Sequence, residues 1–366
     1  MKRQPLDHIP SELLTPADYG RLARDFVDHP AYEYIAGGAG GEITACRNRA
    51  AFNDLQILPR MLRDFRAAST ALALLGQAFR HPILLAPVAH QRLVHPEGEK
   101  ATVAGAGALD AGFVASTLSS VSLEDIAARA TGPCWFQLYF QASREQTLAL
   151  ARRAEDAGYG ALVVTVDAPI NALRHRARRA GFQMPAEVRE ANLLDAPRPP
   201  PRILDPHQSP VFDGLMTDAP RWPDIQWLMA NTRLPVLLKG ILDPRDALMA
   251  RQLGVAGVVV SNHGGRALDG VPASIAALPA VRRAVGPDYP LLLDSGIRSG
   301  GDVFKALALG ANAVLLGQLQ LHALAVAGAL GVAHLLRLMK EELEVTMALA
   351  GTPSLADITP DCLFRP

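Results

Sequence analysis

The chain has 366 residues and carries 36 basic and 36 acidic side chains, which give a formal net charge of zero. Nucleic acids and anionic membranes bind clustered lysine and arginine, so a balanced charge predicts neither kind of partner. The 30 glycines and 28 prolines are a modest excess that indicates many tight turns rather than a disordered chain.

The cysteine content is typical of a reducing compartment. Cys46, Cys134 and Cys362 are far apart and make neither a disulfide framework nor a C-x-x-C metal site. The amino-terminal residues lack the apolar core of a signal peptide, and polar residues interrupt the most apolar segment, 319–336, which predicts a buried helix. We therefore expect a cytoplasmic protein with no metal site and no membrane partner.

Residues 1–80 precede the main pattern of the chain. They carry helical patterns, including one at 16–28, and a hairpin pattern around 71–80 that would close the floor of a barrel. Eight short apolar runs follow, at 83–89, 113–117, 135–139, 161–167, 236–239, 257–263, 291–294 and 313–317. Such runs are typical of buried parallel strands.

Most of these runs are separated by one amphipathic segment of helical length. One such segment begins at Ser143 with a capping-box pattern, and another has Asp243 as its N-cap, Pro244 in its first turn and Gly254 beyond its end. Eight alternating units predict an α/β fold, a (β/α)8 TIM barrel. We expect one domain over 1–366, with an extension at 1–80 and the barrel at 81–350.

A long segment after the fourth run, about 178–220, has no clear periodicity. It contains six prolines between 197 and 210. A loop of this length in a compact domain is usually functional or disordered. Because it follows a strand, it would lie over the carboxyl-terminal mouth of the barrel, and we interpret it as an active-site lid; the alternative is an insertion without a role.

Polar side chains end five of the eight runs, where barrel enzymes place their active sites. They are Gln137 and Tyr139, Thr165 and Asp167, Lys239, Ser261 and His263, and Asp294. Residues two apart on a strand point the same way, so these side chains are expected to meet at one site.

His263 is the candidate base. Two glycines and Arg266 follow it, and the glycines would let a ligand approach closely. A histidine base needs an orienting partner, and Asp167 could accept a hydrogen bond from one of its ring nitrogens.

The seventh run leads into a glycine-rich turn, Asp294-Ser-Gly-Ile-Arg298-Ser-Gly-Gly. Backbone N–H groups at the start of the following helix, together with Arg298, predict a phosphate site between strands seven and eight. No G-x-G-x-x-G follows the first run, so a nicotinamide Rossmann site is not supported.

These motifs together resemble the FMN-dependent 2-hydroxy acid oxidase and dehydrogenase family, over about residues 18–352. The most specific is Ser-Asn-His-Gly-Gly-Arg-Ala-Leu-Asp at 261–269, joined by Phe-Gln-Leu-Tyr at 136–139, Thr-Val-Asp at 165–167 and Leu-Lys-Gly at 238–240. The resemblance implies FMN as cofactor. It places the cofactor against Ala89, Ser116, Gln137, Thr165, Lys239, Ser261, Asp294, Gly296, Arg298, Gly317 and Gln318.

For the substrate, the resemblance implies a carboxylate clamp made of Arg266, Arg174 and Tyr34. Tyr139 would hydrogen-bond the substrate hydroxyl, and His263 would take a proton from the α-carbon or from the hydroxyl, with hydride transfer in the second case. Asp167 would stabilise the imidazolium in both cases.

The chain departs from the family pattern at three places, of which the smallest is Ser295, where many members have glycine. Gln318 stands where the family usually has arginine, so one expected phosphate cation is missing, and FMN would bind more weakly unless another arginine substitutes. Ala177 stands where an acidic residue is common, so the packing of the lid could differ.

The sequence therefore predicts oxidation of an (S)-2-hydroxy acid, lactate-like or mandelate-like, with O2 as acceptor and H2O2 as product. The alternatives are a dehydrogenase that uses a quinone or a cytochrome, another FMN barrel enzyme, and a degenerate barrel kept as a binding module. By the same resemblance, Leu118 stands where glycolate oxidase-like members can carry a bulky aromatic residue, which implies a roomier substrate pocket. By resemblance we expect a homo-oligomer, a homotetramer or an octamer.

Overall fold

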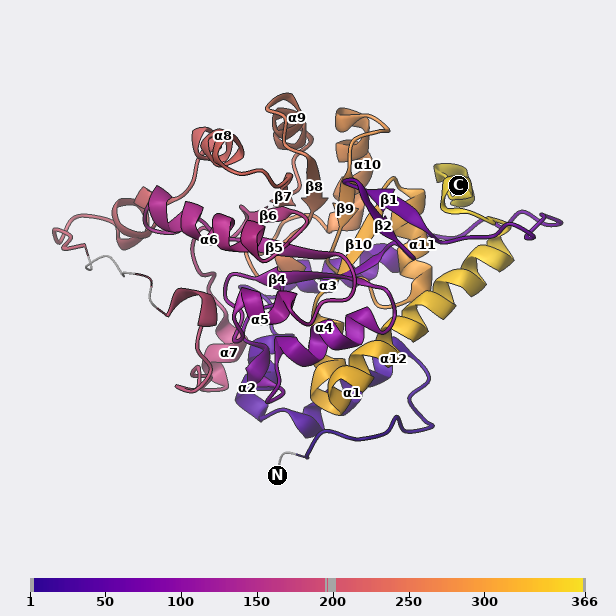
Figure 1. Ribbon diagram of the computed structural model, residues 1–366, viewed down its shortest axis with the longest axis horizontal. Helices are drawn as coiled ribbons and strands as arrows, with labels where there is room; N and C mark the ends of the chain where they lie inside the picture. The colour runs from indigo at the N-terminus through magenta and orange to yellow at the C-terminus, as the bar shows by residue number, and fades with distance from the viewer. Residues whose placement is uncertain (1–2, 195, 197–201, 365–366) are drawn as a thin grey trace.

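The computed structural model describes residues 3–194, 196 and 202–364, and its centre is a closed barrel of eight parallel strands (Figure 1). The strands are β3 (Ile83–Leu85), β4 (Gly112–Ser116), β5 (Cys134–Leu138), β6 (Leu162–Thr165), β7 (Val236–Ile241), β8 (Gly257–Val260), β9 (Leu291–Leu293) and β10 (Ala313–Leu316). Each pairs with its neighbour in chain order, and β10 closes the ring on β3. The predicted (β/α)8 barrel is confirmed.

Side chains fill the interior of the barrel. One buried residue from each strand contributes to a row that we call the floor row: Leu84, Val114, Trp135, Val163, Leu237, Val259, Leu292 and Leu315. The residues beside them in sequence point outward and pack against the helices, as strand alternation requires.

The predicted hairpin is present and covers this floor. It consists of β1 (Leu72–Leu74) and β2 (Gln77–Phe79), which pair antiparallel. Phe79 packs edge-on against Trp135, and Gln77 accepts a hydrogen bond of 3.1 Å from the indole N–H of Trp135. The amino-terminal end of the barrel is therefore closed, and the carboxyl-terminal end is left for a ligand.

Helices surround the strands on the outside (Figure 1). They are α4 (Glu99–Gly107), α5 (Leu123–Ala127), α6 (Arg144–Asp156), α8 (Trp222–Asn231), α9 (Pro244–Gln252), α10 (Ser274–Val285), α11 (Gly300–Ala308) and α12 (Gln318–Ala350). The predicted caps hold: Ser143 accepts from the Gln146 amide and Asp243 from the Arg245 amide.

By length and composition α12 could cross a membrane, but 78% of its most apolar window is buried inside the protein. The buried helix expected near 319–336 is therefore confirmed.

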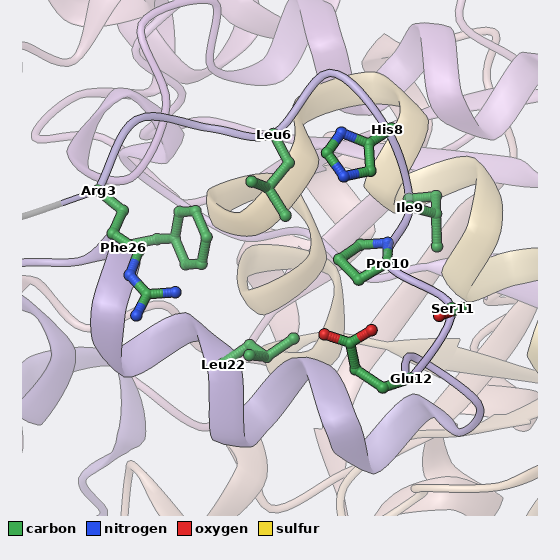
Figure 2. Close-up of a pocket in the computed structure, with 9 residues that line it drawn as sticks. All are labelled: Arg3, Leu6, His8, Ile9, Pro10, Ser11, Glu12, Leu22 and Phe26. Carbon is green, nitrogen blue, oxygen red and sulfur yellow. The ribbon is translucent and has the colours of Figure 1, made fainter.

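The amino-terminal extension contains α1 (Pro16–Phe26), α2 (His29–Ala36) and α3 (Ile43–Asn53). The segment before α1 arches over that helix and encloses a hollow of about 420 Å³ (Figure 2). The hollow is lined by Arg3, Leu6, His8, Ile9, Pro10, Ser11, Glu12, Leu22 and Phe26. None of the predicted site residues lines it.

The first part of the predicted lid packs firmly on the barrel mouth. It starts within the last turn of α7 (His175–Arg179) and contains a short 3-10 turn, Ala191–Leu193. The buried amide of Asn192 donates to the carbonyls of Ser116 (3.2 Å) and Thr117 (3.1 Å) and accepts from the Leu123 N–H (2.8 Å). This part of the segment is therefore a wall of the mouth.

In the rest of the predicted lid, the described residues 202–220 carry two short turns, Pro210–Gly214 and Leu215–Asp218, with no residue of either turn buried. Residues 195 and 197–201, with four of the six prolines, lie outside the described residues. A role in opening and closing the site stays a prediction.

Replacement of Asn192 by alanine is expected to lower the free energy of unfolding by roughly 2–3 kcal/mol, because it leaves the buried Thr117 carbonyl and the Leu123 N–H without the partner they have here. The Ser116 carbonyl loses one donor but still accepts from the Ser119 N–H and hydroxyl. Urea denaturation followed by circular dichroism measures the change. Asn231→Ala is the matched control, since Asn231 is exposed and bonds only the Trp227 carbonyl of its own helix. Equal effects of the two substitutions would show that Asn192 does not fasten the wall.

Candidate active site

The alternation of the strands places the candidate site. Side chains two residues beyond the floor row face the same interior, one layer nearer the carboxyl-terminal mouth. This second row is Ala86, Ser116, Gln137, Thr165, Lys239, Ser261, Asp294 and Gly317. All of these except Gly317 are buried, and all except Ala86 are residues predicted to hold the cofactor. Ala89, also predicted, follows β3 in a half-buried loop at the same end.

Two residues further along, a third row carries the candidate acid–base groups. His263 Nδ1 lies 3.0 Å from Asp167 Oδ1. The His263 side chain is 29% exposed, so its other ring nitrogen can be reached from the mouth. With the Nδ1 proton donated to the carboxylate, Nε2 keeps a lone pair and can take a proton.

Asp167 is held in its charged form. Burial alone would raise its pKa, but the hydrogen bond and charge of His263 and the charge of Lys239 lower the pKa of Asp167 below its ordinary value. Its Oδ2 is buried and has no hydrogen-bond partner among the described residues. The carboxylate can therefore stabilise a positive imidazole beside it.

The backbone after β8 bends sharply to present His263. His263, Gly264 and Gly265 all have positive φ (58°, 68° and 75°), and the His263 N–H donates to Ser261 Oγ at 3.0 Å. A positive φ is uncommon for a residue other than glycine. The two glycines predicted to allow close approach here make this turn possible.

Lys239 makes its contacts within the second row and acts on Asp167 of the third row through its charge. Its ammonium group lies 2.9 Å from Asp294 Oδ2 and donates to Ser261 Oγ at 3.0 Å. Burial alone would lower its pKa, but the charges of Asp294 and Asp167 raise the pKa of Lys239 above its ordinary value. A fixed positive charge at this place suits a cofactor that becomes anionic on reduction.

Gln137 offers a hydrogen-bond donor without a partner. Its Oε1 accepts from Ser116 Oγ and from the Thr117 N–H, both at 3.2 Å. Its Nε2 is buried and has no partner within the described part of the chain. A buried N–H without a partner is costly, so a ligand with a carbonyl or ring nitrogen fits here, as the flavin ring of FMN would.

Arg298 and Gln318 form the candidate phosphate site. Arg298 donates to Gln318 Oε1 at 2.6 Å and to its own neighbour's carbonyl, while burial lowers the pKa of Arg298. A Cβ on Gly317 would meet only two carbons at 3.8–4.0 Å, so this backbone leaves room for a ligand. At Gly296 φ is +92° and a Cβ would lie 2.5 Å from a backbone oxygen, so glycine is required. The site fits a phosphate dianion held by the Arg298 guanidinium. The predicted backbone donors at the start of α11 are partly engaged, since the Gly300 N–H donates to Glu342 Oε2 at 2.7 Å and the Asp302 N–H to Ser299 Oγ at 3.1 Å.

The predicted carboxylate clamp also comes together. The Arg174 and Arg266 guanidinium carbons lie 4.2 and 5.4 Å from the centre of the Tyr34 ring. Arg266 Nη1 donates to three carbonyls at the end of α2, those of Tyr34, Ile35 and Gly37. Burial and the charge of Arg174 lower the pKa of Arg266 to about 10. Within the described residues neither arginine has an ion-pair partner, and two neighbouring cations of this kind attract an anion.

Tyr139 is the uncharged hydrogen-bond donor of the candidate active site. Burial raises its pKa, so the phenol keeps its proton at physiological pH. The groups whose charges act on its pKa are Lys239, Asp167, Tyr34 and Arg266, so it lies close to both the base and the clamp.

Two contacts of the site were missed in the sequence. Phe182 stacks on the Tyr34 ring with centroids 4.2 Å apart. Asn48 and Asn262 exchange two hydrogen bonds of 2.8 and 2.7 Å, which tie α3 to the turn before His263. Asn262 lies inside the motif at 261–269, so the motif could have pointed to it, but nothing local signals Phe182 or Asn48.

Replacement of Gly240 by alanine should destabilise the protein strongly. Its φ is +108°, and a Cβ would lie 2.5 Å from Cβ and Cγ of Asp167. Gly254→Ala is the matched control, because Gly254 also has a positive φ (85°) but open space around it, and it should cost only roughly 1–2 kcal/mol. We expect Gly240→Ala to cost at least about 2 kcal/mol more in urea denaturation. Equal midpoints for the two variants would contradict the close approach of the backbone to Asp167.

Comparison with known proteins agrees with this geometry. The FMN-dependent dehydrogenase family matches residues 23–365. Relatives include the L-lactate oxidase of Alicycliphilus denitrificans, 56% identical over 360 residues and 98% of each chain, and the 4-hydroxymandelate oxidase of Amycolatopsis orientalis, 44% identical over 339 residues, 92% of this chain and 94% of the relative. A solved structure of mandelate oxidase with benzoyl-formic acid has a TM-score of 0.87 at 42% identity, covering 96% of this chain and 98% of that chain. The chain belongs to the FMN-dependent dehydrogenase family, and FMN is its cofactor.

Proposed function

We propose that this protein oxidises an (S)-2-hydroxy acid to the 2-oxo acid and passes the electrons to O2, forming H2O2. L-Lactate is the leading candidate for the substrate. The observation that carries the proposal is the pairing of a base, His263 with Asp167, and a two-arginine clamp at one mouth. The sequence identity between this chain and proteins named L-lactate oxidase supports L-lactate as the substrate and O2 as the acceptor. Mandelate-like acids are the second candidate class, supported by the relatives named mandelate and 4-hydroxymandelate oxidase.

The clamp binds and orients the substrate. Its carboxylate pairs with Arg174 and Arg266, whose charges are otherwise only partly compensated by the Tyr34 ring and by backbone carbonyls. Tyr139, kept protonated by burial, donates to the substrate hydroxyl or to the negative charge that develops there.

His263 then removes a proton. The substrate loses two electrons and two protons, and His263 Nε2 takes one of these protons, from the α-carbon or from the hydroxyl. The imidazolium that forms is stabilised by the Asp167 carboxylate at 3.0 Å. FMN, when bound, supplies the chemistry of a two-electron acceptor, and Lys239 with its fixed charge favours the reduced, anionic form.

The other FMN enzyme classes have less support. A dehydrogenase that depends on a loop cysteine would need a reactive thiol at the mouth. Cys134 begins β5 at the opposite end of the barrel, and burial raises the pKa of its thiol to about 12. A dehydrogenase that uses a quinone or a cytochrome shares the same reductive step and differs only in the acceptor.

We further propose that the protein is a cytoplasmic homotetramer. The three free cysteines agree with a reducing compartment. Exposed apolar side chains on the loop after α3 and near the carboxyl end, including Met61, Leu62 and Leu349, are typical of a surface that packs against another copy. Light scattering on a gel-filtration column measures the mass.

The oxidation itself is tested by anaerobic mixing. The purified yellow protein should lose its flavin absorbance when it is mixed with L-lactate. The same measurement with (S)-mandelate and with glycolate ranks the three substrates by the extent of the absorbance loss. When O2 is readmitted, the colour should return with one H2O2 formed for each flavin reoxidised. If the flavin is bound but no 2-hydroxy acid bleaches it, the proposed oxidation is wrong. If the flavin is bleached but no H2O2 forms after O2 is readmitted, the acceptor is a quinone or a cytochrome.

Asp167→Asn should slow anaerobic flavin reduction by on the order of a hundredfold while FMN stays bound, because a neutral amide cannot stabilise the imidazolium. Stopped-flow absorbance gives the rate, and the ratio of flavin to protein absorbance gives the FMN content. Asp246→Asn on the exposed face of α9 is the matched control and should leave the rate unchanged. A reduction rate within twofold of the unmodified protein would show that His263 works without this carboxylate.

A further inference from the structure

An ion pair outside the mouth joins the two short helices that carry the clamp. Arg176 on α7 pairs through Nε with Glu33 on α2, and its Nη1 lies 3.7 Å from Glu42. The two helices lie side by side (Figure 1). Glu33 is the residue before Tyr34, and Arg176 is two residues beyond Arg174.

We propose that Arg176 is a positioning residue: its ion pair with Glu33 holds Arg174 and Tyr34 together as a substrate-carboxylate clamp. The inference rests on the proposed oxidation of a 2-hydroxy acid and adds a residue that touches neither the substrate nor the cofactor.

The clamp needs such a restraint because its cations repel each other. Arg174 and Arg266 both lie over the ring of Tyr34, and their mutual repulsion contributes to the lowered pKa of Arg266. Arg266 is fastened to the end of α2 by three hydrogen bonds from Nη1. Arg174 has no comparable anchor in the described residues beyond its contact with the Tyr34 ring.

Helix α7 cannot hold Arg174 by itself. It has only five residues, and Arg174 is its N-cap, at the end of an irregular stretch that follows Asp167. Isolated helices of this length are unstable in water, so the position of α7 depends on tertiary contacts. Among the described residues, the ion pair of Arg176 with Glu33 is the salt bridge between α7 and α2.

The side chain of Arg176 also fits closely against α2. A Cβ on Gly37, the residue after α2, would lie 3.3 Å from Cβ and Cδ of Arg176. Glu42, the second carboxylate near Arg176, accepts a hydrogen bond of 2.7 Å from the Gly38 N–H. Arg176 therefore rests on the end of α2 and is bracketed by two carboxylates, while Phe182 stacks on the Tyr34 ring.

The test is Arg176→Gln with Arg178→Gln as the matched control. Arg178 lies on the same short helix, carries the same charge and is exposed. Arg176→Gln is expected to raise KM for L-lactate and Kd for pyruvate on the order of tenfold, with kcat within twofold and FMN content unchanged. Pyruvate binding is read from the change in the flavin absorbance spectrum and needs no turnover. Arg178→Gln should leave all of these values within twofold.

A double-mutant cycle with Glu33→Gln identifies the pair itself. Glu33→Gln should raise KM and Kd in the same direction, and the double variant should be no worse than Arg176→Gln alone, since the second change removes an interaction already lost. Thermal midpoints of all variants check that each folds.

Three results would overturn the inference: unchanged pyruvate binding in Arg176→Gln, the same loss in Arg178→Gln, or fully additive effects in the cycle. A failure of the proposed oxidation looks different, because the unmodified protein would then not be bleached by any 2-hydroxy acid. The comparison of pyruvate Kd values between variants would still decide the role of Arg176 in that case.

Discussion

The alternation of side chains along eight parallel strands is the constraint on which the rest of this structure depends. Because every strand runs the same way around a closed barrel, inward-facing residues form successive rows from the hairpin end to the carboxyl-terminal mouth. The lowest row is apolar and sealed by the hairpin β1–β2. The next row contains the residues that suit the flavin, and the third brings Tyr139, Asp167 and His263 together. The order of the rows follows from the two-residue period alone.

The same constraint decides which charges the protein can bury. Lys239 is 4% exposed, and an unpaired ammonium group at that depth would lose its proton or destabilise the fold. Asp294, from the second strand beyond it in the ring, lies 2.9 Å away and keeps it charged. The formal net charge of the chain is zero, so the attraction for an anionic substrate is local. It arises at the mouth, from Arg174 and Arg266.

Parts of the chain outside the barrel complete the site. Helix α2 of the amino-terminal extension brings Tyr34 to the mouth, and the segment after β6 brings Arg174 and Phe182. Asn192 then ties that segment to the end of β4, beside Ser116. The barrel supplies the base and the residues predicted to bind the cofactor. The clamp is assembled from elements that are distant in sequence, and it depends on the contacts between those elements.

The sequence by itself determined the eight strands, the hairpin, the capped helices and the set of polar residues at the strand ends, because these follow from local periodicity and from turn and capping residues. It also located the seven second-row residues Ser116, Gln137, Thr165, Lys239, Ser261, Asp294 and Gly317. Strands such as β6 and β8 end earlier than their apolar runs, since Asp167 and His263 leave the ladder to face the mouth. Only the tertiary structure decided the pairing of Arg176 with Glu33, of Asn48 with Asn262 and of Phe182 with Tyr34. These partners lie more than a hundred residues apart, and no local pattern marks a contact that forms only when the chain folds.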